Sequence, residues 1–159
     1  AEVDGGAMIL RGTINVNGFG ELDGPTTFHA TSNVAIGSGD RLDIGNATGD
    51  TITYNGGSFT GTGTLVQDGD ATVTAGSTVD IDVSSFDFDG DTISDTTILA
   101  GATMNITGSA ITDAHDGVIT INSGTLNVAT GNEVIFGGEF PLFIPAPWTM
   151  DGSLISTTA

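Results

Sequence analysis

Apolar and polar positions alternate in a five-residue phrase that recurs along the chain, at residues 12–16, 40–44, 77–81, 102–106 and 124–128. In each copy an Asn or Asp stands between two apolar residues, and Thr precedes them in every copy except the second. Period-two alternation is typical of a strand with one buried side. The phrase therefore predicts recurring strands of one kind.

The copies are spaced like the repeats of a solenoid. Their third residues are Ile14, Leu42, Val79, Met104 and Leu126, at steps of 28, 37, 25 and 22 residues. Repeats of roughly 20 to 50 residues are characteristic of solenoids and arrays. We therefore expect an all-β fold, a parallel β-helix (β-solenoid) of about five or six irregular coils. The 37-residue step requires an insertion or an additional coil.

The alternation also predicts which side chains face inward. The expected core pairs are Ile14 and Val16, Leu42 and Ile44, Val79 and Ile81, Met104 and Ile106, and Leu126 and Val128. The expected outward residues, which would stack on one another, are Asn15, Asp43, Asp80, Asn105 and Asn127. Stacked Asn side chains gain hydrogen bonds. Stacked carboxylates repel, so Asp43 and Asp80 would need an ion, an offset or an intervening loop.

An antiparallel β-sandwich is the alternative fold, because the same alternation and density of turns would suit it. Recurrence of the phrase together with its preceding Thr favours the solenoid. The 159 residues suffice for one domain, and we expect a single solenoid domain over residues 1–159.

The charge balance limits the partners. Twenty acidic residues face only Arg11 and Arg41, giving a net charge of −18. A phosphate backbone would be repelled, so we expect no nucleic-acid binding, and multivalent cations are the natural counterions. No run of 18 apolar residues exists, so we expect no membrane span.

One acidic cluster has the spacing of a calcium loop. Asp87, Asp89, Asp91 and Asp95, with Gly90 between them, can wrap oxygen ligands around one Ca²⁺. The spacing resembles the calcium loops of thrombospondin type 3 repeats, although Thr92 stands where those loops have Gly. The alternative interpretation is a plain strand over residues 85–89, with Phe86 and Phe88 inside, followed by a turn at Gly90.

Residues 139–148 form a Pro-rich apolar segment. Three Pro residues prevent a regular strand ladder there. Its large apolar side chains are Phe140, Leu142, Phe143, Ile144 and Trp148. We expect this segment either to cap the core or to dock on a neighbouring subunit or domain.

Catalytic chemistry has little support in the sequence. It contains no Ser, His and Asp set, no nucleophile elbow and no phosphate loop. Some β-helices degrade polysaccharides with paired carboxylates, but an enzyme for acidic glycans normally needs basic residues to hold its substrate. We therefore expect no catalytic residues and no enzyme activity.

Residues 57–69, 75–81 and 122–128 resemble the degenerate repeats of bacterial surface and secreted proteins, of the autotransporter-passenger and filamentous-adhesin type. The resemblance implies an extracellular or cell-surface structural or adhesive segment, part of a fibre, sheath, stalk or large surface protein. The end coils of a solenoid are open edges that can accept another copy, so we also expect self-association or contact with neighbouring repeats. The alternative is a Ca²⁺-dependent module that binds carbohydrate or a host surface, and a polysaccharide-degrading enzyme is a third possibility.

Overall fold

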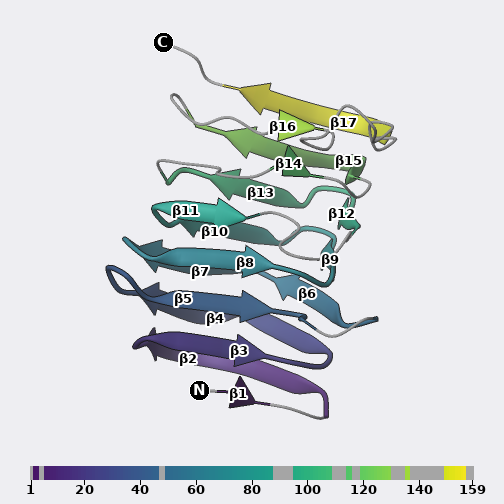
Figure 1. Cartoon of the computed structure of the whole chain (residues 1–159). Coiled ribbons are helices and arrows are strands. Elements are labelled where there is room, and N and C mark those ends of the chain that lie inside the picture. Colours follow the sequence, from purple (N-terminus) through teal and green to yellow (C-terminus); the bar gives the residue numbers. More distant parts are fainter. Residues whose placement is uncertain are drawn as a thin grey trace, which may run out of the picture.

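The protein is a parallel β-solenoid of about five turns (Figure 1). The computed structural model describes residues 2–3, 6–46, 49–87, 95–108, 114–115, 119–129, 135–136 and 149–156. For residues 2–3, 114–115, 135–136 and 149–156 it describes the backbone alone. The described residues contain no helix, and every strand pairing among them is parallel. The predicted β-helix is therefore confirmed, and the antiparallel sandwich is excluded.

Each coil of the solenoid passes through three faces in a fixed order. Coil 1 consists of β2 (Met8–Val16), which crosses from face 1 to face 2, and β3 (Phe19–Leu22) on face 3. Coil 2 repeats this plan with β4 (Thr26–Ile36) and β5 (Arg41–Ile44). Face 1 and face 2 together form a ten-stranded sheet, and face 3 belongs to a five-stranded sheet.

The later coils use separate strands for the three faces. Coil 3 comprises β6 (Thr51–Asn55), β7 (Gly57–Gly61) and β8 (Thr64–Gln67). Coil 4 comprises β9 (Asp70–Val73), β10 (Thr78–Asp82) and β11 (Ser85–Asp87). The stack continues with β12 (Thr96–Ile98), β13 (Thr103–Ile106), β14 (Ala114–His115), β15 (Ile119–Val128), β16 (Ile135–Phe136) and β17 (Thr149–Ser156). At the other end, β1 (Glu2–Val3) pairs with β3 on face 3.

The recurring phrase occupies two different faces. Val79, Met104 and Leu126 align in one column of face 2, as predicted. Leu42 instead lies on face 3, where it pairs with Leu65. Ile14 lies on face 2 but belongs to the column of Ile81, two positions away from that of Val79. The long step between residues 42 and 79 contains the whole of coil 3, which is the additional coil that the spacing allowed.

The core lies inside the stack and is filled by the inward residues of all three faces. Nine of the ten predicted inward residues are buried, and the tenth, Ile14, is partly buried. At the centre, the rings of Phe28, Tyr54 and Phe59 contact one another with centroid distances of 4.8 to 5.9 Å. Edge-to-face and offset rings add about 0.5–1.5 kcal/mol per pair beyond the area they bury.

Glycine permits the tightest corners between faces. Gly61 ends β7 with φ +122°, and a Cβ on it would collide with the carbonyl oxygen of Ile36 in the coil below. Only a residue without a side chain fits this combination of backbone angle and close approach. The corner therefore fixes the rotation of coil 3 on coil 2.

Candidate functional site

A polar ladder runs along the outside of face 2. Its columns are set by strand register, which aligns Asn33, Ser58, Asp80, Asn105 and Asn127. Asn105 Nδ2 donates to Asp80 Oδ1 at 2.7 Å, and Asn127 Nδ2 donates to Asn105 Oδ1 at 3.2 Å. The predicted stacking of Asp80, Asn105 and Asn127 is thus confirmed. Each amide can accept from one neighbour and donate to the other, so the ladder ties several coils together along the axis.

Two of the predicted ladder residues lie elsewhere. Asn15 belongs to an adjacent column of face 2, with Ala35 and Thr60. Asp43 lies on face 3, where it is buried and accepts from Arg41 Nε at 2.5 Å. Because Asp43 and Asp80 are on different faces, the expected repulsion between them does not arise.

Face 1 carries a column of threonines that the phrase did not reveal. Register aligns Thr27, Thr53, Thr72, Thr97 and Thr120, all half-buried on the outside of the sheet. Stacked β-branched side chains pack well against one another on a pleated surface. Five of the 25 Thr residues of the chain therefore stack along the axis on this face.

Three carboxylates join adjacent coils at the corners. Asp40 Oδ1 accepts from the backbone N–H of Gly18 at 2.8 Å, and Asp50 Oδ2 accepts from Gly24 at 2.9 Å. Asp70 Oδ1 accepts from the backbone N–H of Asp95 at 2.9 Å. Corner amides fall outside the strand ladders, so a carboxylate from the neighbouring coil satisfies them. The sequence signal was available as Asp beside Gly in turns, but the partner lies more than 20 residues away.

A buried hydrogen-bond chain crosses the core between faces. Tyr54 Oη donates to Gln67 Oε1 at 3.1 Å, and Gln67 Nε2 donates to Thr96 Oγ1 at 2.9 Å. All three residues are fully buried. Burial raises the pKa of Tyr54 far above its ordinary value, because the phenolate would lose its hydration. The chain links coil 3 to β12, which follows coil 4, from the inside.

The predicted calcium ligands are placed only in part. Asp87 is the last residue of β11 and aligns with Val66 of β8, and Phe86 before it is buried. Asp95 is exposed and follows Asp70 in the same outward position of the next coil. Asp89 and Asp91 lie outside the described residues. Within the described part of the chain, no three His, Asp or Glu side chains gather as a metal site would require.

The predicted apolar interface is not placed at all. Phe140, Leu142, Phe143, Ile144 and Trp148 fall outside the described residues. Whether this segment caps the core or docks elsewhere stays a prediction.

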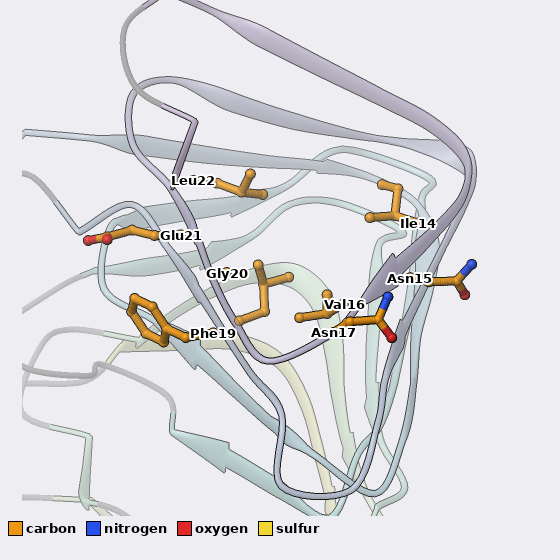
Figure 2. A pocket seen from close by; sticks show the side chains of 9 residues that line it. Ile14, Asn15, Val16, Asn17, Phe19, Gly20, Glu21 and Leu22 are labelled. Carbon is orange, nitrogen blue, oxygen red and sulfur yellow. The ribbon is translucent and has the colours of Figure 1, made fainter. Parts of the chain in front are cut away.

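At the N-terminal end of the solenoid, β4 is the only strand among the described residues that pairs with β2. A cavity of about 310 Å³ lies within coil 1 between face 2 and face 3. In Figure 2, Ile14 and Leu22 point into the coil from the two faces, whereas Asn15 and Glu21 point away. Beside it, Phe19 is 51% exposed and, on face 1, Ile9 is 62% exposed. This end of the core has apolar walls, and among the described residues no strand covers face 1 and face 2 of coil 1 on the N-terminal side.

Comparison with known proteins found no matching family model, no similar curated sequence and no similar solved structure.

No helix that is long and apolar enough to cross a membrane occurs among the described residues.

Proposed function

We propose that this chain is a structural segment, a stiff β-solenoid rod that forms part of an extracellular fibre, sheath, stalk or surface protein. The observation that carries the proposal is the continuity of axial stacking on every side of the coil. On the outside, the face 2 ladder joins successive coils through Asp80, Asn105 and Asn127. Inside, the chain from Tyr54 through Gln67 to Thr96 joins the same region of the stack.

Such stacking resists both bending and extension. Parallel strands place one backbone ladder per coil at about 4.8 Å along the axis, so a load along the rod is shared by many hydrogen bonds. The interior of coils 2 to 4 is filled by aromatic and aliphatic side chains. A packed interior and an outer surface of short polar side chains suit a spacer, and we infer a structural or adhesive role in preference to a catalytic one.

Two measurements test the proposal. Antibodies raised against the purified chain should label intact cells of the source organism, and labelling confined to permeabilised cells would contradict an extracellular role. Small-angle scattering of the monomer should give a particle that keeps its dimensions up to the unfolding transition. A particle that bends or collapses before unfolding would contradict a stiff rod.

A calcium-dependent binding module is the second candidate. Asp70 and Asp95 occupy the same outward position on adjacent coils, and both are exposed. Carboxylates one coil apart repel, and a hard divalent cation relieves this repulsion. Asp87, Asp89 and Asp91 lie between Asp70 and Asp95 in the sequence, and their carboxylates are the further ligands that we propose.

Calcium titration distinguishes the two candidates. A specific site should give a saturable heat signal and a higher melting temperature, and both should be lost in Asp89→Ala. Asp82→Ala, an exposed carboxylate on β10, is the matched control and should keep both effects. Equal responses in the two variants would indicate that calcium acts only as a diffuse counterion, and they would count against the binding module.

A further inference from the structure

We propose that a second copy of this chain stacks on the N-terminal end of the solenoid, with β17 of one copy pairing in parallel with β2 of the next. This inference names the partner of the structural rod proposed above and rests on that proposal. The contact repeats from copy to copy, so it is heterologous and generates a filament.

The N-terminal end has the features of an incomplete interface. Among the described residues, β4 is the only strand paired with β2, so the other edge of β2 presents unpaired N–H and C=O groups. The inward residues Leu10, Ile14 and Leu22 are only partly buried, although they pack on the core. Their counterparts Phe28, Val34 and Ile44 in coil 2 are at 0% exposure. One further coil would complete their burial.

The two ends of the solenoid are complementary parts of one coil. Like β2, β17 crosses from face 1 to face 2 in a single strand, and both show a register shift at that corner. On face 3, the position next to coil 1 on the N-terminal side is already held by β1. Together, β17 of one copy and β1 of the next supply one strand to each of the three faces. The shared coil would then be complete.

Continuing the columns predicts the register of the contact. On face 1, Met150 continues the column of Ile121, Ile98, Val73, Tyr54 and Phe28, which leads to Leu10. On face 2, Ser156 continues the column that leads through Val128 to Ile14. The stacked copies thus extend the apolar column of half-buried Leu10 with Met150, whereas the column of Ile14 continues with the polar residue Ser156.

The charge distribution also favours this orientation. Both arginines and seven of the 20 acidic residues lie within the first 50 residues, whereas the 13 acidic residues after residue 50 have no Lys or Arg among them. Arg11, which is exposed, follows Leu10 at the corner of β2, as Asp151 follows Met150 in β17. In the proposed register these opposite charges are neighbours. A contact between two N-terminal ends would instead bring Arg11 of both copies together, and a contact between two C-terminal ends would bring Asp151 of both copies together.

Sedimentation of the purified 159-residue chain tests the proposal. At 150 mM salt, wild-type chain should pass from monomer to longer species as its concentration rises. At low salt it should remain monomeric, because the net charge of −18 on each copy is then poorly screened. Asp151→Arg should weaken association about fivefold, since it places two arginines together. Arg11→Asp should act similarly, and the two changes combined should restore association.

The matched control is Asp82→Arg, which changes the net charge equally at an exposed position on β10, away from both ends. It should strengthen association or leave it unchanged, because it only lowers the overall repulsion. The proposal is overturned if wild-type chain stays monomeric at millimolar concentration, or if Asp151→Arg behaves as Asp82→Arg does. If the chain stays monomeric but the monomer is stiff, the stacking is overturned and the structural role is not. If the chain stays monomeric and is flexible, the structural role is overturned as well.

Discussion

Coil 1 and coil 3 follow the same alternation of apolar and polar residues, but they differ in burial. In coil 3 the inward residues Ile52, Tyr54, Phe59 and Leu65 are at most 1% exposed, because coils lie on both sides. In coil 1 the inward residues Leu10, Ile14 and Leu22 are only partly covered. Alternation therefore decides which way a side chain points, and the neighbouring coils decide how much stability it contributes.

The largest expected difference concerns the two equivalent core positions Phe59 and Ile14, which share one column of face 2. Phe59→Ala should lower the free energy of unfolding by about 3–5 kcal/mol, because it leaves a cavity beside Phe28 and Tyr54. Ile14→Ala should cost about 1–2 kcal/mol in the monomer, since solvent already reaches this site. Denaturant unfolding at low protein concentration measures both, and equal losses would contradict the comparison.

A pair of glycines sharpens the same contrast. Gly12 in coil 1 and Gly61 in coil 3 both have positive φ, but only Gly61 approaches the backbone of another coil. Gly12→Ala should cost about 1 kcal/mol for the backbone angle alone. Gly61→Ala should cost about 3 kcal/mol or more, because the added methyl collides with the carbonyl of Ile36. Melting curves of the two variants that coincide would argue against tight packing at this corner.

Alkaline pH should weaken the centre of the rod through one residue. Tyr54 is the only Tyr, and the chain has no Cys and no Lys, so few other groups titrate between pH 9 and 12. Burial raises the pKa of Tyr54 above its unfolded value of about 10, so the stabilisation is complete below pH 10 and decreases as the pH rises above it. The slope should reach about 1.4 kcal/mol per pH unit. Tyr54→Phe should remove this slope, at a constant cost of about 1–3 kcal/mol for the lost donor to Gln67.

The smallest effect is expected on the outer ladder. Asn105→Asp replaces the donor to Asp80 with a second carboxylate and should cost about 1 kcal/mol at low salt. Adding Asp80→Asn should restore the stability, because the exchange again places one amide beside one carboxylate. Thermal unfolding of the single and double variants measures this coupling, and strictly additive losses would show that the ladder contributes no axial stability.

The sequence predicted the fold class because the solenoid is built from one short local pattern. Inward orientation needs only alternation, and nine of the ten predicted core residues are buried. Alternation does not predict the register between strands, because the same phrase occurs on face 2 in β10 and on face 3 in β5. Nothing local separates Leu42 from Val79. The long step between them predicted either an insertion or an additional coil, and the two could not be told apart because the strands of coil 3 carry no copy of the phrase.

Contacts between coils were the least predictable from sequence. The partners of Gln67 and Asp40 lie 29 and 22 residues away in the sequence, and only register brings them together. The same holds for the candidate calcium residues. Stacking of coils brings Asp95 next to Asp70, and the spacing of the acidic cluster does not predict this contact. Open edges at the end coils were expected from the fold class, but strand register was needed to identify Leu10, Ile14 and Leu22 as the partly buried residues of coil 1.

Amide hydrogen exchange of β2 and β7, followed as a function of protein concentration, tests the central claim most directly. In dilute monomer, the β2 amides should exchange much faster than those of β7, because β2 is an edge and β7 lies between two coils. As copies stack, β2 should gain protection while β7 stays unchanged. Equal protection of the two strands in dilute solution, or a β2 signal that never depends on concentration, would contradict the account.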